Sequence, residues 1–145
     1  MKIGQTAPAI KLPDQNGKMH ALKDYIGQWV LVYFYPKDDT TGCTKEACQL
    51  RDSFPKFNKS KAVILGISVD SVTSHKKFET KYKLPFTLLA DEHKEVVEKY
   101  GVWQEKSMYG RKYMGTVRTS FLIDPKGNIA KIYEKVKPET HAAEV

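Results

Sequence analysis

Three continuous hydrophobic runs along the chain predict buried β-strands, at Val30–Tyr35, Val63–Val69 and Phe86–Leu89. None of them alternates between apolar and polar residues, as a strand in a half-exposed sheet does. Unbroken apolar runs of this length are typical of strands covered on both faces, as in a parallel sheet. The pattern therefore predicts a central sheet with other elements packed on either side.

Apolar residues recur with a helical period between these runs. The three segments with this pattern are 43–57, with apolar residues at 47, 50, 54 and 57, a segment after Asp70 and Ser71 with Val72, Phe78 and Tyr82 facing inward, and Glu92–Tyr100. Pro55 is expected to kink or end the first helix, and Gly101 to cap the third. Strand and helix thus alternate through the middle of the chain.

This alternation predicts an α/β fold whose parallel core strands are joined by right-handed crossovers and flanked by helices. The two ends of the chain carry different signals. Asn16-Gly17 is a strong hairpin turn, and the sequence at 124–127, Asp-Pro-Lys-Gly, separates the expected strands 119–124 and 129–136. We therefore expect antiparallel hairpins at both ends and a mixed sheet overall.

Length and composition predict one domain over residues 1–145, because 145 residues with 41% hydrophobic content can fill a single core. No run approaches the roughly 18 apolar residues of a membrane span, and the first residues hold no apolar signal segment. We expect a soluble, cytoplasmic protein. Residues 138–145 look like the opening turn of a helix without length, which predicts that a C-terminal helix is truncated.

The net charge of +7 does not by itself indicate nucleic-acid binding. The 24 basic and 17 acidic residues are interspersed, and no run of four or more Lys or Arg occurs. A mixed, solvated surface is the favoured interpretation, with no nucleic-acid partner. The segment Trp103–Tyr113 mixes aromatic and basic residues and could form a stacking platform for single-stranded nucleic acid, but packing of a long loop beside the active site is favoured.

The two cysteines, Cys43 and Cys48, lie where the strand Val30–Tyr35 gives way to a helix. A helix N-terminus offers unpaired N–H groups and the positive end of a dipole, and both stabilise a thiolate. A close pair in a reducing compartment is more often catalytic or metal-binding than structural. This position favours redox chemistry.

Helix geometry gives the two thiols different surroundings. Cys43 shares its face with Ala47 and Leu50 and should point inward, whereas Cys48 lies roughly 140° around the helix on a more polar face. Their Cα atoms would be roughly 9 Å apart, beyond the roughly 7 Å that a disulfide spans. A disulfide therefore requires the helix to unwind. This suits a reaction in which Cys43 is oxidised to sulfenic acid and Cys48 then condenses with it.

Other functions remain open at this point. The pair could serve a general protein disulfide oxidoreductase, or either thiol could simply fill the core. Cys43 and Cys48 could also bind metal with histidines from the set His20, His75, His93 and His141, but their spacing is unlike that of zinc ligands, so we expect no metal and assign no histidine a role.

The motif Pro36-x-x-x-Thr40-x-x-Cys43 resembles the active site of the peroxiredoxins, thiol peroxidases on an elaborated thioredoxin fold. Further similarity to the bacterioferritin comigratory protein, or Q-type, branch extends over nearly the whole chain, in the cysteine five positions on and in the segments 33–39, 103–110, 113–115 and 118–124. One departure is Thr41, where the Q type often has proline.

The resemblance implies a role for each matching residue. Cys43 would attack the peroxide, Cys48 would resolve the sulfenic acid, and the Thr40 hydroxyl would bridge thiolate and peroxide. Pro36 would shield the site from water, and the charge of Arg118 would stabilise the thiolate and polarise the peroxide.

It also implies a monomeric or weakly associating enzyme that reduces hydrogen peroxide and organic hydroperoxides without a haem, flavin or metal cofactor. Thioredoxin or a similar dithiol would recycle it.

Overall fold

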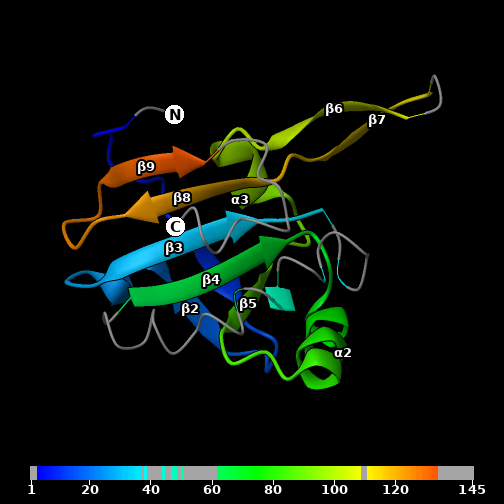
Figure 1. Cartoon of the computed structure of the whole chain (residues 1–145), viewed down its shortest axis with the longest axis horizontal. Coiled ribbons are helices and arrows are strands. Elements are labelled where there is room, and N and C mark those ends of the chain that lie inside the picture. The colour runs from blue at the N-terminus through cyan, green and yellow to red at the C-terminus, as the bar shows by residue number, and fades with distance from the viewer. Residues whose placement is uncertain are drawn as a thin grey trace.

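The structure, a computed structural model, describes residues 3–36, 38, 44, 47, 48, 50, 62–108 and 111–133. Its centre is a five-stranded sheet in the order β5-β4-β3-β8-β9 (Figure 1). The strands are β3 (Trp29–Phe34), β4 (Ala62–Ser68), β5 (Thr87–Ala90), β8 (Thr119–Ile123) and β9 (Ile129–Tyr133). β3, β4 and β5 run parallel, whereas β8 pairs antiparallel with β3 and β9 with β8. The prediction of a parallel centre with a C-terminal hairpin is confirmed.

β3 lies at the centre of the sheet and is buried on both faces. Val30, Val32 and Phe34 point into one hydrophobic core, and Leu31 and Tyr33 point into the other, which Tyr35 joins just beyond the strand. Because side chains alternate along a strand, its two sets of residues belong to two separate cores. This explains why the sequence of β3 shows no polar alternation.

The N-terminal hairpin is formed by β1 (Lys11–Pro13) and β2 (Met19–Ala21), followed by the 3-10 helix η1 (Leu22–Tyr25). Gly17 has a φ of +82°, the left-handed conformation that favours glycine at this turn. Asp14 closes the turn by accepting hydrogen bonds from the backbone N–H groups of Asn16 and Lys18. The predicted hairpin is therefore present, as a separate two-stranded sheet.

Helix α2 (Val72–Tyr82) begins where the sequence predicts. The Ser71 side chain accepts a hydrogen bond from the Ser74 N–H at 3.1 Å, which caps the helix. Phe78 is buried in the second core, and Tyr82 packs against it. The inner face also contains His75, which is fully buried and to which the sequence pattern assigns no role.

The third helix, α3 (Glu95–Lys99), is shorter than the predicted Glu92–Tyr100. A turn occupies the first residues, and Lys94 has a left-handed φ of +63°. The Asp91 side chain instead reaches forward and accepts hydrogen bonds from the N–H groups of Val96 and Val97, so the helix starts late. Gly101 follows its end with a φ of +70°, as expected of a residue just past a helix.

The segment expected to be a loop, Trp103–Tyr113, is instead most of a β-hairpin. β6 (Trp103–Met108) pairs antiparallel with β7 (Arg111–Thr116) and projects from the body of the molecule (Figure 1). The loop prediction was wrong because these strands are polar, and a polar strand has no hydrophobic run by which the sequence would identify it.

The predicted first helix is only partly within the described residues. Thr44, Ala47, Cys48 and Leu50 are helical, and Ala47 and Leu50 are buried in the second core. Phe54 and Phe57 lie outside the described residues. Within the described part of the chain, no helix is long and apolar enough to cross a membrane.

Candidate active site

The carboxyl ends of β3, β4 and β5 meet at one edge of the sheet, and a polar residue follows each of them. Asp38 follows β3, Asp70 follows β4 and Asp91 follows β5 directly. The parallel pairing of the three strands places these ends side by side. In open α/β sheets this edge is where ligands bind and chemistry occurs.

Two of the predicted site residues lie at this edge. Pro36 is two residues beyond the end of β3 and is half-buried. Arg118 directly precedes β8, whose residue Thr119 pairs with Phe34 at the last position of β3. The antiparallel register therefore carries Arg118 past the end of β3, toward the chain that leads to Pro36.

Cys48 is a free thiol on the helical segment and is half-buried. Helical spacing predicts that Cys48 lies on the more polar face, and the half-buried thiol lies at the border between that face and the core. Cys43 and Thr40 lie outside the described residues, so their predicted roles stay predictions.

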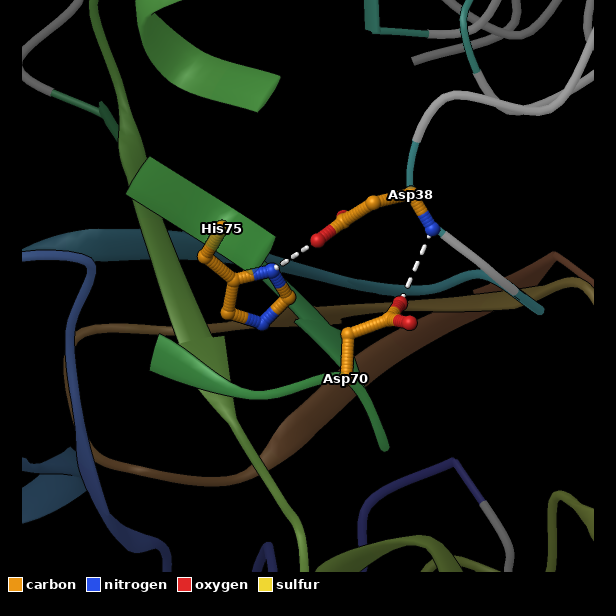
Figure 2. A group of neighbouring side chains, drawn as sticks. All are labelled: Asp38, Asp70 and His75. Carbon is orange, nitrogen blue, oxygen red and sulfur yellow. Dashed lines mark hydrogen bonds and ion pairs between the residues drawn. The ribbon is translucent and has the colours of Figure 1, made fainter. Parts of the chain in front are cut away.

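Asp38 is the centre of a hydrogen-bond network at this edge (Figure 2). Its Oδ1 accepts from the Tyr35 hydroxyl at 2.6 Å, and its Oδ2 accepts from the Ser74 hydroxyl at 2.9 Å. Its backbone N–H donates to Asp70 Oδ2 at 2.8 Å, and Asp70 in turn accepts from the Ser68 hydroxyl. A loop residue is thus held by the ends of two strands and by α2.

His75 completes the network from the inner face of α2. Its Nδ1 lies 2.7 Å from Asp38 Oδ2, and its Nε2 lies 2.9 Å from the carbonyl oxygen of Leu89 in β5. The side chains of His75 and Asp38 are 0% and 3% exposed, so water does not compete for either contact. Burial makes such a pair costly to break from one side only.

Tyr35 acts as a neutral donor in this network. Burial, with the neighbouring Tyr33 and Asp38 adding to it, raises the pKa of Tyr35 well above its usual value. The phenol therefore keeps its proton at any physiological pH and continues to donate to Asp38.

Asp38, Asp70 and His75 could also be considered as metal ligands, because their ligand atoms lie within 4.8 Å of one another. Asp38 Oδ2 and His75 Nδ1 already contact each other at hydrogen-bond distance, and the Oδ2 atoms of both carboxylates accept from hydroxyl groups. The donors around these atoms fit a hydrogen-bond network, and we interpret the three residues as part of that network and not as a metal site.

Sequence reasoning missed His75, although a signal for its position existed. Positions 75, 78 and 82 follow helical spacing, so His75 shares the inner face of α2 with Phe78 and Tyr82. The partner of His75 carried no such signal, because Asp38 lies 37 residues away along the chain.

An apolar pocket of about 380 Å³ lies elsewhere in the molecule, and its lining includes Ile10, Leu22, Tyr25 and Val30. Val30 is near the start of β3, whereas Pro36 follows its end. No cysteine is among the described residues that line the pocket, and it lies away from the end of β3 that leads to the thiol motif, so we do not assign the chemistry to it.

Comparison with known proteins agrees with the resemblance seen in the sequence. The AhpC/TSA family matches residues 3–132. The chain is 51% identical over 145 residues to a protein named putative peroxiredoxin bcp from Coxiella burnetii, covering 100% of this chain and 96% of that one. It is 46% identical over 144 residues to peroxiredoxin Bcp of Bacillus subtilis, covering 99% and 92%.

Solved structures with the same fold belong to the same group of proteins. A cysteine-to-serine mutant of PrxQ from Xylella fastidiosa has a TM-score of 0.94 at 35% identity and covers 99% of this chain and 92% of its own. The bacterioferritin comigratory protein of Xanthomonas campestris, described for its alkyl peroxide reduction activity, has a TM-score of 0.91 at 35% identity and covers 99% and 94%.

The fold is therefore that of the thioredoxin-like α/β proteins, as predicted. The chain belongs to the AhpC/TSA family, in its bacterioferritin comigratory protein or Q-type branch of peroxiredoxins. It is an enzyme, a thiol peroxidase that takes a peroxide as substrate and a thiol as reductant.

Proposed function

We propose that peroxide reduction by this chain runs through Cys43 as the attacking thiolate and Cys48 as the resolving thiol. The observation that carries the proposal is the motif Pro36-x-x-x-Thr40-x-x-Cys43 at the carboxyl end of β3, with a free, half-buried thiol at Cys48 on the helical segment that follows.

The reaction divides into three balanced steps. The Cys43 thiolate attacks one oxygen of the hydroperoxide, the O–O bond breaks, and the alkoxide or hydroxide leaves and takes up a proton, which leaves Cys43 as sulfenic acid. The Cys48 thiol then condenses with the sulfenic acid, so that a disulfide forms and water leaves. An external dithiol reduces the disulfide by exchange and is itself oxidised.

The other predicted residues assist the first step. Thr40 would bridge the thiolate and the peroxide with its hydroxyl, and Pro36 would exclude water without adding a backbone donor. Arg118 would supply a fixed positive charge to the thiolate and to the leaving oxygen. The β3 to β8 register supports this last role, because it carries Arg118 to the end of β3 from which Pro36 continues.

The second step requires movement. In a regular helix, residues five apart have Cα atoms roughly 9 Å apart, and a disulfide spans at most roughly 7 Å. We therefore infer that the helical turns between Cys43 and Cys48 unwind in each cycle. Thioredoxin, itself a dithiol, would be the reductant, and the enzyme would act as a one-domain monomer in the cytoplasm on hydrogen peroxide and small organic hydroperoxides.

The test is peroxide consumption by reduced protein. One equivalent of hydrogen peroxide should remove both thiols and give one Cys43–Cys48 disulfide by peptide mass mapping. Cys43→Ser should abolish rapid consumption, whereas Cys48→Ser should stop at sulfenic acid and overoxidise. The two variants are matched controls for each other, because the chain has only these two cysteines.

Either of two results would contradict the proposal. Cys43→Ser that consumes peroxide as fast as the parent would exclude Cys43 as the attacking thiolate. Cys48→Ser that turns over normally with thioredoxin would remove Cys48 from the cycle. A protein that exchanges disulfides with other proteins but reacts slowly with peroxide would instead be a general disulfide oxidoreductase.

A further inference from the structure

Asp38, a loop residue beyond β3, is buried and hydrogen-bonded to several distant parts of the fold. Within the described part of the chain, its two carboxylate oxygens and its backbone N–H make four hydrogen bonds, to Tyr35, Asp70, Ser74 and His75. These partners come from the end of β3, the end of β4 and helix α2. Asp38 is therefore a point where the sheet and α2 together hold the chain that follows β3.

The contact with His75 is buried on both sides, since the side chains of His75 and Asp38 are 0% and 3% exposed. Nε2 faces the carbonyl oxygen of Leu89, which can only accept, so Nε2 carries a hydrogen. One further proton then lies between Nδ1 and Asp38 Oδ2, which are 2.7 Å apart. The carboxylate of Asp38 accepts from the hydroxyl groups of Tyr35 and Ser74, and we assign it the acceptor role toward Nδ1 as well.

Asp38 is close in sequence to the residues proposed to react with the peroxide. Asp38 precedes Thr40 by two residues and Cys43 by five. Two residues of chain span at most about 7 Å, so a displacement at Asp38 is passed to Thr40 with little room for compensation. Misplacement of reacting groups by about 1 Å can reduce a rate by about a hundredfold.

We propose that His75 is a positioning residue of this peroxidase: its Nδ1 holds Asp38, and Asp38 fixes the start of the segment that carries Thr40 and Cys43. The inference rests on the proposed role of Cys43. Among the described residues, the hydrogen-bond partners of Asp38 lie in α2 or just beyond the ends of β3 and β4, so this fixed point would persist if the helical turns after Cys43 unwound.

Two substitutions distinguish the contribution of His75 Nδ1 from that of His75 Nε2. The side-chain nitrogen of asparagine is as many bonds from Cα as Nδ1, so His75→Asn keeps a donor toward Asp38. The nitrogen of glutamine corresponds to Nε2, so His75→Gln keeps a donor toward Leu89 and leaves Asp38 without one. Thr80→Ala, on the exposed side of the same helix, is the control for a change in α2 itself.

The measurement is the second-order rate constant for sulfenic acid formation at Cys43, trapped with dimedone and counted by mass spectrometry. All variants carry Cys48→Ser, which isolates the first step. We expect His75→Asn to retain most of the parent rate and His75→Gln to be about tenfold slower or more. In an Asp38→Ala background, His75→Gln should cause no further loss. Urea midpoints determined in parallel show that each variant is folded.

Equal rates for His75→Asn and His75→Gln would overturn the inference, as would a further loss in the Asp38→Ala background. A rate that changes with zinc chloride or with EDTA only while His75 is present would indicate a metal site and overturn it too. If the parent itself forms no sulfenic acid at Cys43, the proposed function fails instead, so the two failures are distinguishable.

Discussion

Gly66 lies in the middle of β4, opposite Tyr33 of β3, and its replacement by alanine tests the packing of the second core. A Cβ at this position would lie 2.8 Å from three atoms of the Tyr33 side chain, the ring carbons Cε1 and Cζ and the hydroxyl oxygen. The backbone of Gly66 does not have a positive φ, so the obstacle is the ring and not the strand conformation. Glycine is required here because the Tyr33 ring lies directly over the strand.

The cost follows from the room available to the ring. Ordinary contact begins at 3.4 Å, so the ring must retreat by about 0.6 Å. Tyr33 is 1% exposed, stacks on Tyr35 at 5.4 Å and meets Phe86 edge-on at 6.0 Å, so both neighbours oppose the movement. Overpacking of this kind costs about 1–3 kcal/mol, and the lower chain entropy of alanine returns about 0.5–1 kcal/mol. We expect a net loss of about 1–2 kcal/mol.

The assay is urea unfolding followed by circular dichroism, with Tyr33→Leu as the second variant. With a slope of about 2 kcal/mol per molar, Gly66→Ala should lower the midpoint by roughly 0.5–1 M. Tyr33→Leu removes the ring and is itself destabilising, because it leaves a cavity. In that background, however, Gly66→Ala should cost almost nothing.

Two results would refute the reasoning about Tyr33. One is a Gly66→Ala protein with the midpoint of the parent. The other is a Gly66→Ala cost that is the same with and without the Tyr33 ring, since the loss would then arise from the strand and not from this contact.

Three further predictions concern buried polar groups, all measured as urea midpoints. Burial raises the pKa of Asp14, but hydrogen bonds from His20 and two backbone N–H groups outweigh this effect, so the pKa lies below its usual 3.8. The charged Asp14 therefore stabilises the fold above pH 3.8. The stability advantage of the parent over Asp14→Asn should vanish as the pH falls through the lowered pKa. Burial raises the pKa of Asp91 despite its backbone hydrogen bonds, and its Oδ1 has no hydrogen-bond partner among the described residues. Asp91→Asn should therefore be at least as stable as the parent at neutral pH. The stability of the parent should rise relative to Asp91→Asn as the pH falls through the raised pKa toward 3.8. Tyr100→Phe removes the 2.7 Å hydrogen bond to the Pro8 carbonyl oxygen and should cost about 1 kcal/mol, and an unchanged midpoint would mean that water replaces the hydroxyl.

Much of the fold could be predicted from local patterns. β3, β4 and β5 start and end within a residue or two of their hydrophobic runs, and α2 begins after Ser71 as its cap predicts. These elements depend on burial and capping, which are written into neighbouring residues. α3 was predicted too long because Asp91, which lies three residues before the N-cap residue Lys94, accepts hydrogen bonds from the N–H groups five and six positions on, and the helix starts only after Lys94.

Part of the candidate site can likewise be predicted from local sequence patterns, and part cannot. The motif from Pro36 to Cys43, with Cys48, names the chemistry from sequence alone, because a thiol at the start of a helix after a buried strand is a local arrangement. The helical spacing of the two cysteines likewise predicts a conformational step, since it follows from helix geometry and a count of residues.

Only the tertiary structure joins Asp38 to His75 and brings Arg118 past the end of β3. The parallel pairing of β3 with β4 brings the residue that follows one strand beside the helix that follows the other, and the antiparallel pairing of β3 with β8 sets the register of Arg118. These residues lie tens of positions apart in the sequence, and the residues next to one of them do not indicate which distant residue it contacts. The sequence by itself determined the thiol motif and the strands around it, because both are local patterns. Only the pairing of the strands in the sheet determined which distant polar residues lie near that end of β3.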